Sequence, residues 1–118
     1  MDSQTLQIFR ESLTVNNIFV AGNILNEHSA VLYDICNFYA QLYDSGSREM
    51  ITWLFDNATV KQFLRTNFTL GLSVFHMAAQ NVDIALIKQM MKHKIVTVDE
   101  NDVVMYSNRV RAAVQAHT

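Results

Sequence analysis

Apolar residues recur along most of the chain at spacings of three and four positions, which is the period of an amphipathic α-helix. This pattern predicts helices at residues 3–13, 16–25, 29–43, 48–57, 59–66, 73–80 and 83–93. The first two predicted helices have the buried stripes Leu6, Phe9 and Leu13, then Ile18, Ala21 and Leu25. Because the chain has no proline and only three glycines, its loops are expected to be short.

Residues 95–106 follow a different pattern. Residues 95–98 and 103–106 are rich in β-branched and other strand-favouring side chains, and residues 99–102 are typical of a turn. We predict a short β-hairpin or extended loop here, and then a helix from Ser107. The alternative is that Asp99 caps one last helix that runs to about Ala116. The predicted fold class is therefore all-α, built of stacked antiparallel helix pairs, with one short hairpin at residues 95–106.

Two blocks of the sequence align at an offset of 36 positions. Residues 39–43 match residues 75–79, and residues 50–55 match residues 86–91. Each block reads as helix, tight turn, helix. A repeat of this length predicts a stack of helix pairs, in which each pair covers the apolar face of its neighbour.

The second block resembles an ankyrin repeat. Residues 71–79 follow the family pattern of glycine, any residue, threonine, proline, leucine, histidine, any residue, alanine, alanine, with Ser73 and His76 at the threonine and histidine positions. Residues 84–91 stand where the family places its second helix. The resemblance implies paired helices that pack closely at the small alanines. It also implies that His76 has a structural role.

The chain departs from the family pattern at three positions. Val74 replaces the proline, Val82 replaces the glycine between the helices, and Lys94 replaces the glycine after the second helix. The resemblance covers residues 67–99 well, residues 30–66 weakly and the first 28 residues hardly at all. Divergent repeats without proline resemble those in proteins of large DNA viruses.

Composition favours one soluble helical domain over residues 1–118. Half of the residues are hydrophobic and 17% are charged, which is too apolar for a disordered chain. No apolar run approaches the roughly 20 residues that span a bilayer, and the N-terminus has no secretory signal pattern. The single cysteine, Cys36, is expected to be buried and inert, in a reducing compartment. These features predict a cytoplasmic protein, with the nucleus as the alternative.

The candidate chemistry is sparse. The four histidines are too widely spaced to place two metal ligands on one helix face. Three isolated glycines cannot form a phosphate-binding loop, and no serine elbow or local Cys–His dyad occurs. Asp34, within a predicted helix, is read as solvent-facing in preference to a buried base. We therefore predict no catalytic, cofactor-binding or metal-binding residue and a protein that is not an enzyme.

The leading hypothesis is a protein–protein interaction module, a regulator or host-factor binder without catalytic activity. Tyrosine and tryptophan are favoured interface anchors, and aromatic residues are numerous around the predicted helices at 29–43 and 48–57. The candidate partner-binding residues are Tyr39, Tyr43, Trp53 and Phe55. The terminal helices are not strongly polar, which favours self-association as a homodimer.

Two alternatives use the same helices differently. In a winged-helix nucleic-acid-binding protein, residues 73–93 would supply two helices and the hairpin at 95–106 would supply the wing. Phosphate would then meet five cations of the C-terminal third: Lys88, Lys92, Lys94, Arg109 and Arg111. The formal net charge of −2 counts against nucleic acid. A compact bundle of the apoptosis-regulator or death-domain kind would have a central buried helix and bind proteins in a groove.

Overall fold

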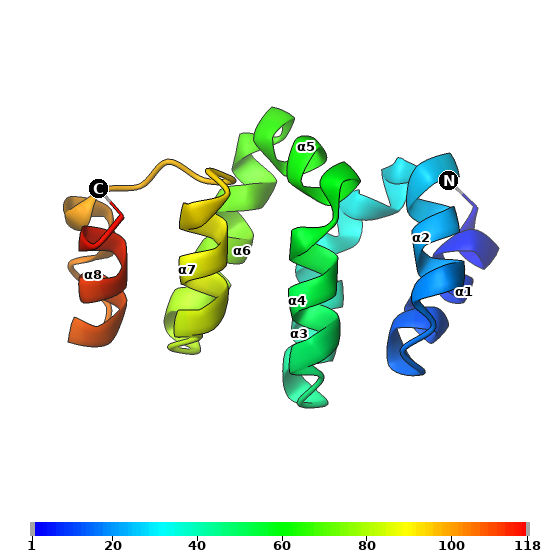
Figure 1. The fold of residues 1–118 in the computed structure, drawn as a ribbon, viewed down its shortest axis with the longest axis horizontal. Helices are drawn as coiled ribbons and strands as arrows, with labels where there is room; N and C mark the ends of the chain where they lie inside the picture. The colour runs from blue at the N-terminus through cyan, green and yellow to red at the C-terminus, as the bar shows by residue number, and fades with distance from the viewer. Residues whose placement is uncertain (1, 118) are drawn as a thin grey trace. The chain divides into compact units, whose positions relative to one another are not determined.

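The computed structural model describes residues 2–117 and is all-helical (Figure 1). Within these residues no strand occurs, so the predicted all-α class is confirmed. Packing divides the chain into two units, Met1–Phe63 and Leu64–Thr118, which are described separately below as unit 1 and unit 2. The single domain expected from the sequence stays a prediction.

Unit 1 is built of two antiparallel helix pairs (Figure 1). The first pair is α1 (Ser3–Thr14) and α2 (Ile18–Glu27). A 3-10 helix, η1 (Ser29–Asp34), leads into the second pair, α3 (Ile35–Asp44) and α4 (Arg48–Asp56). The single helix predicted at 29–43 is therefore divided at Asp34, because its first part winds as a 3-10 helix. The next helix, α5 (Ala58–Thr66), contains the division between the two units.

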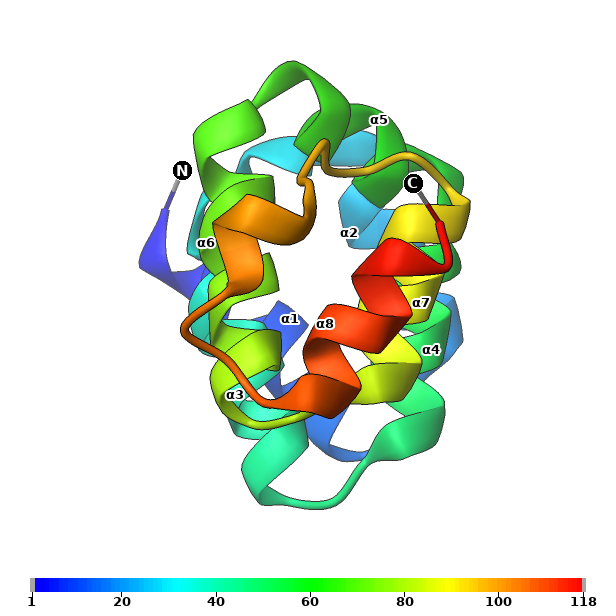
Figure 2. The same cartoon turned by 90° about the vertical axis from the view of Figure 1, so that its left-hand side faces the viewer.

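Unit 2 contains α6 (Phe68–Gln80), α7 (Ile84–Lys92), the 3-10 helix η2 (Glu100–Val103) and α8 (Asn108–Gln115). Helix α7 packs against both α6 and α8, and Figure 2 shows α8 beside it. The sequence pattern places residues 67–72 between two predicted helices, at a break around Gly71, and this is wrong, since α6 runs through this glycine. Gly71 is buried, and a Cβ atom there would lie 3.5 Å from both the Leu64 carbonyl oxygen and Val96 Cγ1.

Of the β-hairpin or extended loop predicted at residues 95–106, the hairpin is wrong for the described structure, whereas the helix predicted from Ser107 is confirmed as α8, with Ser107 as its N-cap. Ile95, Val96 and Val98 are buried, so their β-branched side chains pack into the core and pair with no second strand. Local strand propensity is overridden here by tertiary packing. The alternative interpretation of Asp99 as a helix cap is partly correct. Its carboxylate accepts hydrogen bonds from the Asn101 and Asp102 amides, but the helix that it caps is the short η2.

The helix pairs α1–α2, α3–α4 and α6–α7 are each joined by the same kind of turn. Asn16, Gly46 and Val82 have positive φ angles of 58°, 73° and 52°. At each of them the amide bonds back to the helix that is ending, as in the Schellman motif. At the second turn, for example, the Gly46 amide donates to the Tyr43 carbonyl (3.1 Å) and the Ser47 amide donates to the Leu42 carbonyl (2.9 Å). A fourth such motif ends α7 at Lys94, with φ 54°.

The repeat seen in the sequence coincides with this turn. Gly46 and Val82 occupy equivalent turn positions and are separated by the same offset of 36 that aligns the two sequence blocks. Buried side chains keep this offset in both helices of the pair: Phe38 and Val74, Tyr39 and Phe75, Leu42 and Ala78, Met50 and Leu86, Ile51 and Ile87, Leu54 and Met90. The turn at Asn16 adds the first helix pair to the series, although the sequence pattern hardly reached it. Asparagine tolerates positive φ, and this was the available signal.

Each of the helices α1 to α8 has exposed positions. None of these helices is both long and apolar enough to cross a membrane.

Candidate protein-binding surface

The first helix pair exposes four large hydrophobic side chains. Ile8, Val15, Ile18 and Phe19 are 42%, 69%, 52% and 76% exposed, and we call them the α1–α2 patch. Single exposed apolar residues are ordinary on protein surfaces. Four of them lie within residues 8–19, and Ile8 and Val15 line one pocket, so exposed apolar side chains are concentrated in this part of unit 1, as at interaction sites.

The patch borders a shallow pocket. Ile8, Val15 and Val20 supply its apolar lining, together with Glu11, Ser12 and Asn17. Ser12 lies almost fully inside, and its hydroxyl donates to the Phe9 carbonyl oxygen at 2.6 Å. The one buried polar side chain of this lining is thus satisfied within α1.

The core packing of α1 fixes which of its faces is exposed. Phe9 and Leu13 are fully buried, and the Phe9 ring meets Phe38 of α3 edge-on with centroids 4.9 Å apart. Since residues one or two positions away on a helix point elsewhere, Ile8 and Val15 are left outside this contact.

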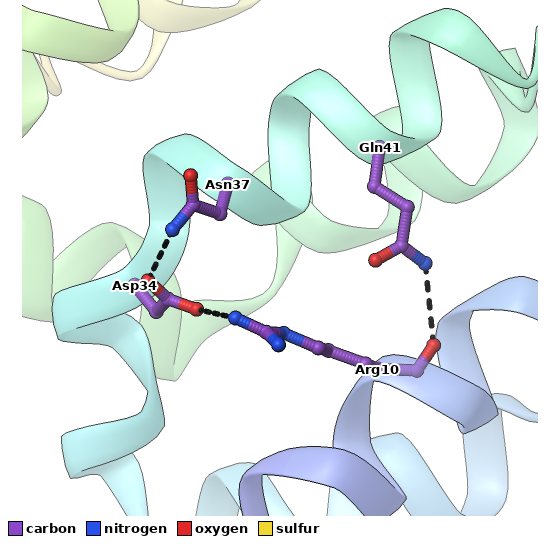
Figure 3. A network of polar contacts seen from close by, with 4 residues as sticks. All are labelled: Arg10, Asp34, Asn37 and Gln41. Carbon is purple, nitrogen blue, oxygen red and sulfur yellow. Dashed lines mark hydrogen bonds and ion pairs between the residues drawn. The ribbon is translucent and has the colours of Figure 1, made fainter.

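A polar network also fixes α1 against η1 and α3 (Figure 3). Arg10 Nη2 lies 2.6 Å from Asp34 Oδ2, and Asn37 Nδ2 donates to the other carboxylate oxygen at 2.5 Å. Gln41 Nε2 donates to the Arg10 carbonyl at 3.3 Å and to Thr14 Oγ1 at 2.8 Å. Asp34, which we expected to face solvent, is therefore only partly exposed, and it is an ion-pair and hydrogen-bond partner that helps to orient α1.

The residues proposed from the sequence as partner contacts have a different position. Tyr39 and Phe55 are fully buried, with ring centroids 6.3 Å apart, so they join α3 to α4 and present no surface to a partner. Tyr43 is half-buried beside Tyr39, at 5.8 Å between centroids. Trp53 is half-buried, and its Cζ2 atom would lie 3.9 Å from a Cβ atom at Gly22 of α2. Tyr43 and Trp53 stay predictions as contact residues.

Sequence reasoning missed the α1–α2 patch because it sought buried stripes. It placed Ile18 in such a stripe, whereas Ile18 begins α2 and is exposed. The available signal was an excess of apolar residues outside the stripes. Ile8, Val15 and Phe19 all lie off the faces that Phe9, Leu13 and Leu25 define.

Within residues 2–117, no group of three or more His, Cys, Asp or Glu side chains could hold a metal ion. In unit 2, His76 Nδ1 lies 2.7 Å from the Tyr106 hydroxyl, and this contact ties α6 to the residues that precede α8.

Cys36 is half-buried in α3, and its environment disfavours the thiolate. Burial raises the pKa of the Cys36 thiol above its ordinary value, and the negative charge of Asp34 raises this pKa further. We expect alkylation by iodoacetamide to show a higher midpoint pH in the folded protein than in urea, because the thiolate is the nucleophile. The raised pKa of Cys36 also stabilises the folded state. This contribution is fully present below the ordinary thiol pKa and is lost as the pH rises through the raised pKa. A folded-state midpoint at or below the unfolded one would contradict this prediction.

Comparison of the chain with protein-family models, with curated proteins and with solved structures found no match.

Proposed function

We propose that this chain is a protein-binding module without catalytic activity, built of divergent ankyrin-like helix pairs, and that the α1–α2 patch contacts its partner. The observation that carries the proposal is the exposure of Ile8, Val15, Ile18 and Phe19 around one turn. Ile8, Ile18 and Phe19 stand on helices, so their backbone is ordered before a partner binds, which lowers the entropy cost of binding.

The backbone at the turns supports the ankyrin-like part of the proposal. Val82 and Lys94 stand where the family has glycine, and both have positive φ, a conformation that favours glycine. The positive φ angle that the family pattern expects at these two positions is thus retained, although the glycine is replaced. The contact between His76 and Tyr106 agrees with a structural histidine at the motif position.

The two alternatives receive less support. A winged helix needs a hairpin, and residues 95–106 hold none. A death-domain-like bundle would bury a central helix, whereas each helix from α1 to α8 has exposed positions. The turn shared by three helix pairs favours repeats over a bundle.

Affinity capture with a matched pair of variants tests the proposed function. Phe19→Asp places a charge in the α1–α2 patch, and Met105→Asp places the same charge at the 78% exposed Met105 of unit 2. We expect a partner captured by the unmodified chain to bind Phe19→Asp on the order of tenfold or more weakly, as for an interface hot spot. Met105→Asp should bind as the unmodified chain does. Circular dichroism checks that both variants fold.

Recovery of nucleic acid with no specific protein would contradict the proposal, and so would equal binding of the partner by both variants. Sedimentation of the same proteins tests the expected homodimer. A dimer that dissociates in Phe19→Asp identifies a second copy as the occupant of the α1–α2 patch. A monomer leaves the patch to a different protein.

A further inference from the structure

Helices α7 and α8 enclose a groove in unit 2. Ile84 and Lys88 line it from α7, one turn apart, and the α8 side is lined at four positions of one helix face: Arg109, Ala112, Ala113 and Ala116. The three alanines have short side chains, so they leave an open channel of about 360 Å³ beside α7. The groove therefore has an apolar floor with one cation on each side.

Neither cation of the groove is neutralised within the described residues. Lys88 and Arg109 are exposed and form no ion pair there, whereas the neighbouring Arg111 lies 3.5 Å from Glu100. No carboxylate lines the groove, although acidic residues outnumber basic ones in the chain by eleven to nine. Two uncompensated positive charges thus flank an apolar channel.

This arrangement fits an acidic protein segment better than it fits nucleic acid. A phosphate backbone would contact the two cations but would leave the alanine floor uncovered. Nucleic-acid affinity also depends on many phosphate contacts, and only two cations, Lys88 and Arg109, line the groove. A peptide that alternates carboxylates with small apolar side chains could satisfy both the cations and the floor.

We propose that the groove between α7 and α8 binds an acidic, amphipathic segment of a partner protein, with carboxylates at Lys88 and Arg109 and apolar side chains over the alanines. The groove lies in unit 2, and this proposal does not depend on the α1–α2 patch.

Fluorescence anisotropy with a designed peptide tests the proposal. The probe is a fluorescein-labelled peptide of repeated Glu-Ala-Leu-Glu, and its control has lysine in place of every glutamate. We expect saturable binding of the acidic probe alone, weakened roughly tenfold in the double variant Lys88→Glu, Arg109→Glu. The matched double variant Lys92→Glu, Lys94→Glu changes the net charge equally outside the groove lining. It should weaken binding by less than about threefold.

A neutral substitution separates the groove from general charge attraction. Ala112→Gln lengthens a side chain in the groove without changing any charge. It should weaken binding of the acidic probe at least about fivefold. Equal losses in the two charge variants, an unaffected Ala112→Gln, or no saturable binding would overturn the proposal. Duplex DNA that displaces the probe at equal concentration would assign the cations to nucleic acid and overturn it as well.

Discussion

Replacing Phe9 with alanine is expected to lower the free energy of unfolding by about 3–5 kcal/mol, the usual cost of truncating a fully buried phenylalanine. Phe9 has no exposed surface, and it contacts the Phe38 ring edge-on at 4.9 Å between centroids. The truncation leaves a cavity between α1 and α3 that the Arg10–Asp34 ion pair cannot fill. A loss of this size is a large share of the stability of a small protein.

The adjacent residue supplies the control for this prediction. Ile8 is 42% exposed, so Ile8→Ala should change the free energy of unfolding by less than about 1 kcal/mol. Trp53 is the only tryptophan of the chain and lies in unit 1, so its fluorescence during urea unfolding measures both variants locally. Similar losses in Phe9→Ala and Ile8→Ala would mean that α1 does not pack as described.

Gly46→Val is expected to cost about 2 kcal/mol of unfolding free energy. Gly46 has φ 73°, and an added Cβ atom would meet nothing within 4 Å. The cost therefore comes from the backbone alone, because β-branched residues strongly disfavour positive φ. The same urea titration measures it. An unchanged midpoint would show that the turn can relax out of the left-handed region.

Introducing a glycine at another residue with positive φ should change the free energy of unfolding in the opposite direction. Lys94 is exposed and holds φ 54° at the end of α7, so Lys94→Gly should raise the free energy of unfolding by about 1 kcal/mol. Val82→Gly is a less direct test, since Val82 is half-buried and its removal also loses packing.

Much of the fold could be predicted from the sequence, because helix periodicity is a local property. The ends of α1, α4 and α7 lie within a residue or two of the predicted ends, and α8 begins one residue after its predicted start at Ser107. The internal repeat was readable because the same buried positions recur at one offset.

The predictions were wrong where tertiary packing, and not local sequence, determines the secondary structure or the exposure of a residue. Ile95, Val96 and Val98 favour a strand but are buried outside any sheet, and Gly71 favours a break but lies inside α6. The α1–α2 patch was missed because the exposure of a side chain depends on what else covers α1 and α2, although the apolar residues outside the predicted stripes pointed to it. Tyr39 and Phe55 were chosen for their residue type, which is shared by cores and interfaces alike.

The turn that joins the two helices of each pair is short, and its residues take part in both helix ends. Asn17 and Asp83 close the preceding helix with their amides, and with their side chains they cap the next one, accepting from the Val20 and Leu86 amides. One residue thus serves two helix ends, and the contacts within a pair join residues that are close in sequence. Such contacts need little loop closure, so the helix pairs can form early and locally during folding. An added residue at these turns would separate the residue that ends the first helix from the residue that caps the second. In the extended segment before η2, no residue has both functions.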